Sequence, residues 1–510
     1  MASRSKLPPL RLVGPADRAF GPRERLTFNY GPGSVPNQQM VEAALASEPE
    51  PTFATAAYAE PRDWGYIGLL AFTAVLLIRP QDSIPGLSSL HLAEVCAIIG
   101  IGPMLLHRFA RRLPVFRITA ETVGVVVLGL AILVTVPFSI WPGGALDQFT
   151  DYYVKTSLMF LLMMNTLTTP QRLERINWLI VLCMGYIAAR GVFDYARGVN
   201  LLEGGRLAGA VNGMFGNPND LAMNMVTFMP VAAIFAMSRH QPVLRRLVSA
   251  GIVVLMMATI VFTKSRGGVL GLCVMLLALV VLGAKVRPGF AAIVVVSVLG
   301  ATPFMPQSFW TRMASMFDEQ VDKQQFTGSS EARRIVMMEG IHTFLERPFT
   351  GVGAGQFKNY NPPGRKERWR ETHNALIQVA AETGLLGLLA FSFLIVRAGI
   401  AAAVTRKMLK RPRGRGQPDP LGAVMSETDR DTLYAHTVAM TTGLIGWFTC
   451  SMFASVAFGW TFYYLLALVV AAREMTRDRL TAARALRVPG TKPMSVPVAK
   501  FSRRMARGVA

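Results

Sequence analysis

The sequence predicts an all-α, polytopic membrane protein with about twelve transmembrane helices. Of its 510 residues, 52% are hydrophobic and only 16% are charged, and the mean hydropathy is +0.36. Apolar stretches of about 20 residues, the length that crosses a bilayer, recur along the chain. Because hydrocarbon offers no water to unpaired backbone groups, each stretch must be helical. This composition excludes an ordinary soluble globular protein.

The apolar stretches define the expected spans, nine before residue 307 and three after residue 372. The expected boundaries are 64–79, 89–107, 121–141, 153–168, 174–194, 217–237, 246–263, 267–284, 288–306, 373–400, 432–454 and 456–472. The first stretch is short for a bilayer span, and very few residues separate the last two.

The domain organisation follows from these spans and from the polar segments between them. The N-terminal segment contains many Pro, Gly and charged residues without an apolar period, which is typical of disorder. From the N-terminus, the expected segments are a disordered cytoplasmic tail (1–63), transmembrane helices (64–306), a large periplasmic loop (307–372), transmembrane helices (373–472) around a basic cytoplasmic loop (401–431), and a basic cytoplasmic tail (473–510).

The formal charge of +22, with an isoelectric point near 10.4, would suggest a nucleic-acid partner in a soluble protein. Here the excess of Lys and Arg concentrates in alternate short segments such as Arg406–Arg415, whereas Pro142–Asp151 contains neither residue. This bias favours cytoplasmic termini and no nucleic-acid partner. It places the loop 307–372 on the opposite face, where cytoplasmic ATP is not available. The chain also contains no G-x-x-x-x-G-K-[ST] motif.

A glycine-rich segment before the sixth span contains the first candidate binding residues. Gly205–Ala210 includes Arg206 and leads into Gly213–Asp220. Asn217 is a favourable N-cap, and Pro218 suits the first helical position. The free N–H groups of a helix N-terminus and a planar guanidinium both suit an anion such as phosphate. The alternative, a glycine-rich loop before a well-capped helix, is favoured by the residues taken alone.

The turn Thr263–Gly268 between the seventh and eighth spans brings Arg266 to the same face as Arg206. A cation at a membrane boundary is usually an anchor whose charged end reaches the water. Two observations favour a ligand site instead. This face is poor in cations, and the pair Gly267-Gly268 would let the backbone approach a ligand. Both interpretations remain open.

The loop 307–372 is expected to contain an amphipathic helix over Glu331–Glu346 that lies on the outer membrane surface. Its apolar face comprises Ile335, Met338, Ile341, His342 and Leu345. Gly351–Phe357 resembles a nucleotide-binding loop only superficially, because no strand precedes it. A run of basic residues follows this segment and is expected to be solvated or to contact lipid headgroups. It comprises Arg365, Lys366, Arg368 and Arg370.

His373 lies where this loop meets the tenth span, close to Glu371. An imidazole there can accept a hydroxyl proton near neutral pH. Glu382 lies within the following apolar run, where an acid is costly unless it is paired. It is therefore a functional or helix-bridging candidate. The offset of nine residues puts Glu382 roughly opposite His373 on an ideal helix.

Taken together, four segments resemble the O-antigen ligase family, which includes polysaccharide polymerases and bacterial protein O-oligosaccharyltransferases. In chain order, the segments are Arg206 with Gly213–Asn219, Thr263–Gly268, Pro348–Phe357 and His373–Gly387. The many spans and the single large outer loop agree with that family. Ile78–Gln81, in addition, resembles members linked to exopolysaccharide clusters.

The resemblance implies a GT-C-like glycosyltransferase of the bacterial inner membrane that needs no metal and no cofactor. Its donor would be a glycan on undecaprenyl diphosphate, transferred on the periplasmic face with inversion at the anomeric carbon. Arg206 and Arg266 would hold the diphosphate, and His373 would activate or orient the acceptor hydroxyl. Asn217 and Asn219 would complete the substrate site. Since the bond energy already resides in the lipid diphosphate, no nucleotide is required.

The sequence leaves the acceptor open. Lipid A, a growing glycan and a protein are alternatives, which correspond to the synthesis of lipopolysaccharide, exopolysaccharide or glycoprotein. A different class, a polysaccharide or lipid transporter, would show interrupted helices in two related halves, with charges near mid-membrane. No convincing internal repeat is present, and the candidate residues gather at one interface. A non-catalytic assembly subunit is a third alternative.

Overall fold

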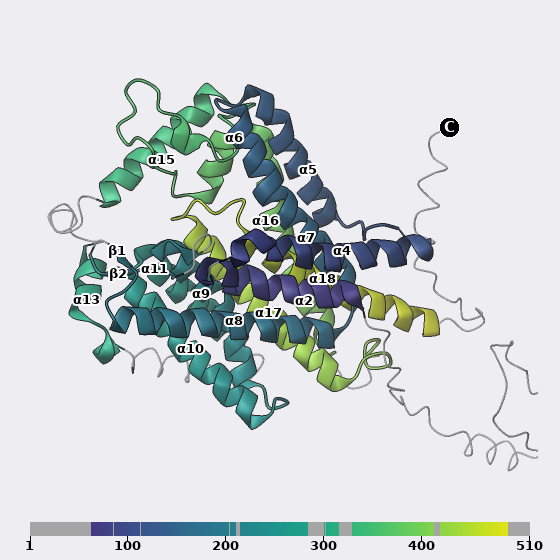
Figure 1. The fold of residues 1–510 in the computed structure, drawn as a ribbon. Helices are drawn as coiled ribbons and strands as arrows, with labels where there is room; N and C mark the ends of the chain where they lie inside the picture. The colour runs from purple at the N-terminus through teal and green to yellow at the C-terminus, as the bar shows by residue number, and fades with distance from the viewer. Residues whose placement is uncertain are drawn as a thin grey trace, which may run out of the picture. The chain divides into compact units, whose positions relative to one another are not determined.

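The computed structural model describes residues 63–487, apart from residues 85, 113, 203, 211–214, 284–299, 301, 316–328 and 413–418. The described residues are mostly helical, as expected (Figure 1). Apart from Asp63, the expected N-terminal tail lies outside them. The one small sheet that they contain is an antiparallel pair of two-residue strands.

The elements follow one another along the chain with short connections. In the first half they are α2 (Trp64–Ile78), α3 (Pro80–Ser83), η1 (Leu87–Leu90), α4 (Leu92–Ala110), α5 (Ala120–Thr135), η2 (Val136–Phe138), α6 (Pro142–Asp147), the π-helical turn η3 (Gln148–Val154), α7 (Lys155–Thr166), α8 (Pro170–Ala196), β1 (Leu201–Leu202), β2 (Arg206–Leu207), α9 (Pro218–Met237) and α10 (Val243–Thr263). In the second half they are α11 (Arg266–Gly283), η5 (Thr302–Phe304), α13 (Gln307–Ala314), α15 (Ser329–Glu346), η6 (Phe357–Asn359), α16 (Ala375–Leu409), α17 (Glu427–Ser451) and α18 (Trp460–Arg487).

Seven of the described helices are long and apolar enough to cross a membrane, namely α4, α5 with η2, α8, α9, α10, α11 and α16. Four further expected spans coincide with α2, α7, α17 and α18, which are helical but do not meet the same combination of length and apolarity. The expected span 288–306 lies largely outside the described residues. The total of twelve spans therefore stays a prediction.

Two helices extend beyond the expected spans. α16 continues nine residues past the expected end at 400, to Leu409, and α18 continues to Arg487 rather than ending at 472. The end of α16 is stabilised by Arg430 of α17, whose Nε donates to the Leu409 carbonyl at 2.8 Å. Apolar content marks where hydrocarbon ends, whereas a helix ends where its last carbonyls find other partners.

α9 is the most enclosed of the seven candidate spans, with 83% of its apolar window buried. It packs against α8, α10, α11 and α17. Small residues on α17 allow this, because a Cβ at Gly443 would collide with the Thr227 carbonyl and a Cβ at Gly446 would lie 2.8 Å from Val226 Cγ1. Such small-residue contacts let helix backbones approach closely. The N-terminus of α9 is thereby held firmly within the helical unit.

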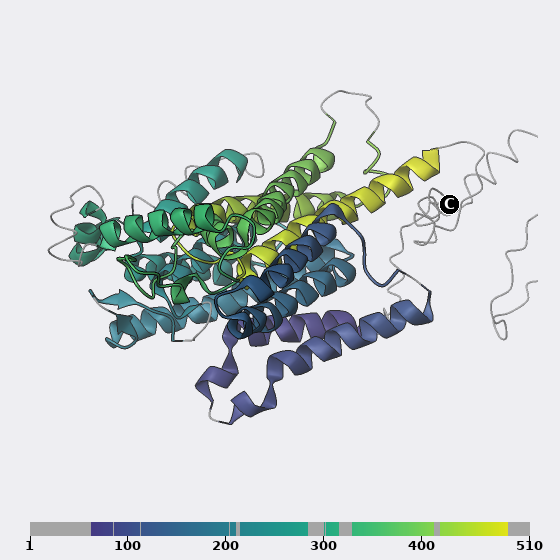
Figure 2. The same ribbon diagram turned by 90° about the horizontal axis from the view of Figure 1, so that it is seen from above.

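The connections that carry the candidate residues lie at one end of the helical unit. Figures 1 and 2 both show β1, β2, α13 and α15 toward one end, with the C-terminal part of α18 toward the other. This arrangement agrees with the expectation that the candidate residues share one face. α2 and α4 pack together along one side of the unit (Figure 2).

Candidate functional site

Arg206 lies in the β1–β2 hairpin between α8 and α9, where it pairs with Leu202. The hairpin is tied to the end of α8, because Asn200 Nδ2 donates to Asp194 Oδ2 at 2.9 Å. From this base the Arg206 guanidinium reaches across to other elements. Its Nη2 donates to Asn219 Oδ1 at 3.0 Å, and its Nε donates to the Thr263 carbonyl at 3.3 Å. The fold therefore joins the first two candidate segments.

Asn217 caps α9 as predicted, and its side-chain oxygen accepts the Asn219 N–H at 2.9 Å. Asn219 has a different task. Its Oδ1 accepts both Arg206 Nη2 and the Ser265 hydroxyl, the latter at 2.8 Å. Ser265 Oγ in turn accepts the Gly268 N–H at 3.2 Å. Asn219 therefore orients Arg206. Gly213 and Met214 lie outside the described residues.

The turn between α10 and α11 buries its cations. Lys264 is 5% exposed and Arg266 is 9% exposed, whereas an interfacial anchor extends its charged end into water. Lys264 adopts a left-handed conformation, with φ 48°, and its Nζ donates to the Gly204 carbonyl at 2.9 Å. Arg312 of α13 joins them, since its Nε donates to the Lys264 carbonyl at 3.1 Å. Arg266 Nη1 lies 3.4 Å from Ser315 Oγ.

The two glycines of this turn serve helix packing. The approach of a ligand to this backbone was one of two interpretations left open, and the packing of these glycines gives it no support. A Cβ at Gly268 would lie 2.6 Å from Ala222 Cβ of α9, and one at Gly267 would lie 2.9 Å from Phe453 Cβ. The absence of side chains lets α11 pack closely on α9 and on the α17–α18 connection.

Arg206, Lys264, Arg266 and Arg312 are together called the basic cluster. Burial and the positive charges of Arg312, Arg333 and Arg266 lower the pKa of Arg206 to about 9. Burial, Arg312 and Arg206 also lower the pKa of Lys264. Both shifts indicate cations that are short of water and repel one another. An anion with several charges would relieve that repulsion, and guanidinium groups suit the oxygens of a diphosphate.

The loop Pro348–Phe357 fills a break in α16. Gly384 interrupts the helix, with φ 64° and ψ −162°, a conformation essentially restricted to glycine. A Cβ there would lie 2.6 Å from the Phe349 carbonyl carbon, and a Cβ at Gly351 would collide with the backbone of Glu382. Three backbone hydrogen bonds join loop and helix: Val352 N–H to Ala381 O at 2.9 Å, Gly353 N–H to Glu382 O at 2.9 Å, and Leu385 N–H to Pro348 O at 2.7 Å.

Glu382 clamps this loop to α16. The side chain is 4% exposed, and its Oε2 accepts the Gly355 N–H at 2.8 Å while its Oε1 accepts the Phe357 N–H at 3.4 Å. A carboxylate that accepts backbone N–H groups can be buried at a tolerable cost. Glu382 was expected to be a functional or helix-bridging residue, and its partner in the structure is this loop rather than a second helix. The glycines of this loop allow that close docking.

His373 is held against the α17–α18 connection. Its backbone N–H donates to Ser455 Oγ at 2.9 Å, and Asn374 Nδ2 donates to the Met452 carbonyl at 3.3 Å. Asn374 also caps α16 by accepting the N–H groups of the second and third residues beyond it, at 3.0 Å and 3.1 Å. The φ of His373 is 51°, a conformation that costs energy for any residue other than glycine.

Burial and the positive charges of Arg333 and Arg370 lower the pKa of His373 to about 4. The imidazole is therefore neutral at neutral pH and has a lone pair for a hydroxyl proton. Arg333, on α15, also lowers the pKa of Arg206. Because one side chain acts on both groups, the basic cluster and His373 lie within electrostatic range of the same helix.

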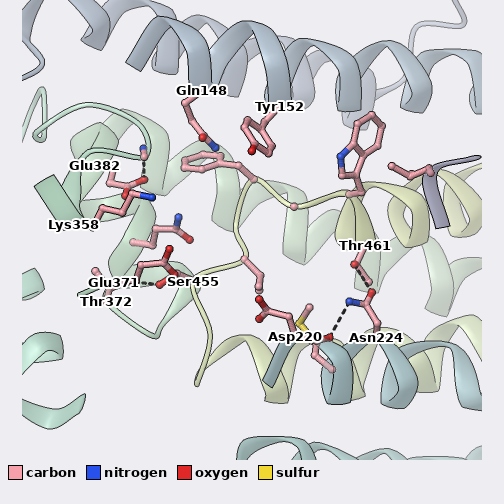
Figure 3. Close-up of a pocket in the computed structure, with 18 of the residues that line it drawn as sticks. Gln148, Tyr152, Asp220, Asn224, Lys358, Glu371, Thr372, Glu382, Ser455 and Thr461 are labelled. Atoms are coloured by element: carbon pink, nitrogen blue, oxygen red, sulfur yellow. Dashed lines mark hydrogen bonds between the residues drawn. The ribbon is translucent and has the colours of Figure 1, made fainter. Parts of the chain in front are cut away.

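A cavity of about 460 Å³ lies beside these residues. Figure 3 shows Gln148 and Tyr152 entering from one wall and Asp220 and Asn224 from the opposite one. Glu371 and Thr372, which immediately precede His373, also line it, as does Glu382. Our sequence analysis did not select Gln148, Tyr152 or Asp220. Only Asp220 carried a signal, as an acid in the first turn of the helix that Asn217 caps.

The surroundings of the cavity correct one expectation. Lys366, Arg368 and Arg370 are exposed as expected, but Arg365 is only 8% exposed. Its guanidinium lies 4.3 Å from the Phe357 ring centre and donates to carbonyls of the surrounding loop, including Phe357 O at 2.7 Å. On α15, Met338, Ile341, His342 and Leu345 are exposed, while Ala332, Val336 and Thr343 are buried. The helix thus has two distinct faces.

The chain was compared with known proteins. No curated protein matches it. Residues 251–392, from α10 to α16, match the family model described as O-antigen ligase. The matched region includes Arg266, the loop Pro348–Phe357 and His373, and Arg206 precedes it. This match supports the assignment to the O-antigen ligase family that the four segments predicted, and three of those segments lie within the matched region.

Proposed function

We propose that the protein transfers a glycan from undecaprenyl diphosphate to an acceptor hydroxyl on the periplasmic face of the inner membrane. The family match supports glycan transfer of the ligase or polymerase type. The observation that carries the proposal is the basic cluster, which gathers four buried or partly buried cations from three segments, and Arg333 of α15 acts electrostatically on both this cluster and His373. The oxygens of a diphosphate suit the paired donors of guanidinium groups.

The transfer is a single displacement. The acceptor oxygen attacks the anomeric carbon from the side opposite the diphosphate, and the carbon–oxygen bond to the diphosphate breaks with its electron pair remaining on the diphosphate. The configuration of the anomeric carbon is inverted. The hydroxyl proton passes to the neutral imidazole of His373 and then to solvent. Arg206 and Arg266 stabilise the negative charge that develops on the leaving diphosphate. The chemistry that we assign to these residues requires no metal.

The two asparagines have distinct roles in this proposal. Asn219 holds the Arg206 guanidinium, so it acts on the donor through that residue. Asn217 starts α9, whose first N–H groups lie beside the basic cluster and add partial positive charge. A donor diphosphate in the cluster would therefore meet both side-chain and backbone donors.

The interruption of α16 does not favour the transporter alternative. Interrupted helices in transporters expose backbone groups to a substrate or ion near mid-membrane. α16 is interrupted at Gly384, but the exposed groups are paired with the loop Pro348–Phe357 of the same chain. The break therefore builds the wall of the site, and three of its backbone groups, Ala381 O, Glu382 O and Leu385 N–H, are already paired.

The proposal is tested by incubating the purified full-length protein with a glycan on undecaprenyl diphosphate and membrane extracts as acceptor source. Wild-type protein should consume the donor, and Arg206→Ala and His373→Ala should not do so at a comparable rate. Equal donor consumption by all three proteins would refute the proposal. The product lost on deletion then identifies the acceptor as lipid A, a growing polysaccharide or a protein.

A further inference from the structure

The cavity and the basic cluster lie on two sides of the N-terminus of α9. Asn219 contacts Arg206, whereas the next residue, Asp220, lines the cavity. The charged residues that line the cavity are Asp220, Glu371, Glu382, Arg79 and Lys358. Arg79 is paired with Asp82, its Nε lying 2.8 Å from Oδ2. The cavity is therefore acidic on balance, whereas the adjoining cluster is strongly basic.

The acidic character makes the cavity unsuitable for a diphosphate, because like charges in a partly dry site repel strongly. It is suitable for hydroxyl or amino groups, which donate hydrogen bonds to carboxylates. The protein around Glu371 restricts its access to water and raises its pKa, an effect that Lys358 partly offsets. A hydrogen-bond donor or cation placed beside Glu371 would stabilise its carboxylate.

The opposite wall adds an aromatic face and an amide. Gln148 and Tyr152 both belong to η3, a π-helical turn, and Figure 3 shows them directed toward the same space. Single π-helical turns inside longer helices are frequent at functional sites. An aromatic ring offers its face to the C–H groups of a sugar ring, and an amide can both donate to and accept from hydroxyls. The volume of about 460 Å³ is that of a small-molecule site.

We propose that this cavity is a subsite for an uncharged or amino-bearing sugar unit, in which Asp220 and Glu371 accept hydrogen bonds and Tyr152 covers one face of the ring. The subsite rests on the proposed glycan transfer. It extends that proposal by assigning diphosphate binding and sugar binding to two separate places. The diphosphate occupies the basic cluster, and the sugar lies on the other side of the α9 N-terminus. Thr372 and Ser455 line the cavity and are hydrogen-bonded to each other, and Ser455 Oγ also accepts the backbone N–H of His373, so the cavity adjoins the segment that carries His373.

The sugar can come from two sources, the first sugar of the donor or a sugar of the acceptor. A cysteine reporter distinguishes them without requiring turnover. Val456→Cys places a thiol on the cavity wall, and Lys358→Cys provides a second reporter at an exposed lining position. The partly accessible Cys96 and Cys273 are first replaced by Ala. The full-length protein in nanodiscs is then labelled with a maleimide, and Lys366→Cys, which lies outside this cavity, is the matched control.

Four probes are compared for protection of the reporters: undecaprenyl diphosphate, undecaprenyl diphosphate bearing N-acetylglucosamine, methyl glucoside and methyl glucuronide. Protection by the sugar-bearing lipid but not by the bare lipid would identify the donor sugar. Protection by methyl glucoside alone would identify an acceptor sugar. In either case Lys366→Cys should stay fully labelled. Protection by undecaprenyl diphosphate alone, or by none of the probes, would overturn the subsite.

Charge selectivity gives a second measurement. Methyl glucuronide should protect at least about tenfold less well than methyl glucoside, because its carboxylate faces Asp220 and Glu371. Asp220→Asn together with Glu371→Gln should reduce that difference. Measurable and equal protection by both glycosides in the protein with Asp220 and Glu371 intact would contradict the proposed recognition. Reporter protection does not depend on transfer, so the two proposals are tested separately. The subsite would be refuted if no sugar protected the reporters, even while Arg206→Ala still abolished donor consumption. Glycan transfer would be refuted if donor consumption were unchanged in the variants, even while sugars protected the reporters.

Discussion

Asn219 holds Arg206 in place, with 3.0 Å between the asparagine Oδ1 and the guanidinium Nη2. The same oxygen accepts the Ser265 hydroxyl at 2.8 Å, so a residue at the start of α9 links the β1–β2 hairpin to the α10–α11 turn. A guanidinium with two long-range contacts, here to Asn219 and to the Thr263 carbonyl, has lost much of its rotational freedom before a ligand arrives. Such preorganisation is what a site for a developing charge requires.

Asn219→Ala is expected to lower kcat/KM for the lipid-linked donor by roughly 10–100-fold, since hydrogen bonds to charged groups are each worth about 1.5–3 kcal/mol. Asn219→Asp keeps an oxygen for Arg206 but adds a negative charge beside the diphosphate, so it should raise KM more than it lowers kcat. The measurement is steady-state donor consumption. A purely structural role would instead lower the thermal midpoint of both variants and leave KM unchanged.

Arg206→Lys and Arg266→Lys should each impair transfer, because lysine keeps the charge and loses the planar pair of donors. Arg197→Lys is the matched control, since Arg197 is an exposed arginine at the end of α8, close in sequence to the hairpin. Donor consumption by the purified variants decides the matter. Wild-type rates in both cluster variants would show that these arginines act only in packing.

The topology predicts opposite labelling of two exposed positions. A cysteine at Lys366 should react with a membrane-impermeant maleimide added to the periplasmic side, and a cysteine at Arg411, whose side chain is 51% exposed, should not. Both variants are made after replacement of Cys96 and Cys273. The reverse pattern would place the basic cluster and His373 on the cytoplasmic face and exclude the proposed reaction.

The positions of the helices could be predicted because the bilayer imposes them. α9, α10 and α11 begin and end within a few residues of the expected spans, since hydrocarbon accepts only apolar side chains over a fixed thickness. Beyond the hydrocarbon, apolar content no longer predicts where a helix ends. The extra turns of α16 depend on Arg430, which lies in a different helix. Its contact with the last carbonyls of α16 has no signal in the local sequence.

The candidate site was predicted only in part. Two of the predicted segments meet, because Arg206 contacts the Thr263 carbonyl of the α10–α11 turn, and Arg333 acts electrostatically on both Arg206 and His373. A glycine pair signals that something approaches the backbone closely, but it does not say what. At Gly267-Gly268 the approaching groups are Ala222 and Phe453 of the same chain. The cavity wall could not be predicted, because Tyr152 and Asp220 come from segments that meet only through tertiary packing.

The pH dependence of transfer should differ from that of an exposed histidine. Our sequence analysis placed the imidazole near its ordinary range, whereas burial together with Arg333 and Arg370 lowers the pKa of His373 to about 4. The base is active when deprotonated, so kcat/KM, which reports the free enzyme, should fall only as the pH decreases toward about 4. Donor binding brings negative charge beside the arginines and should raise the pKa, moving the acidic limb of kcat to higher pH.

His373→Ala should remove this acidic limb and lower kcat by about 10²–10⁴-fold while donor binding stays nearly intact. His373→Gln separates base catalysis from positioning, because glutamine can hold a hydroxyl without accepting its proton at the same pH. Considerable activity in His373→Gln with no acidic limb would assign a positioning role. Near-wild-type rates in His373→Ala would remove this residue from the mechanism.

The break in α16 offers a test of how the loop and the helix build the site. Gly384→Ala should destabilise the protein by about 1–3 kcal/mol, because alanine is strained at this backbone conformation and its Cβ would press on Phe349. Gly399→Ala, in the same helix, is the matched control. Gly399 is exposed, and a Cβ there would meet no atom within 4 Å. Alanine at that helical position should be neutral or stabilising by about 0.5–1 kcal/mol.

The measurement is the thermal midpoint of the full-length protein in nanodiscs, together with donor consumption at a temperature where both variants are folded. Gly384→Ala should lose activity even there, because displacement of Pro348–Phe357 releases Glu382 and shifts the wall behind His373. If Gly384→Ala matched Gly399→Ala in both stability and activity, the docking of this loop would have no part in holding the site.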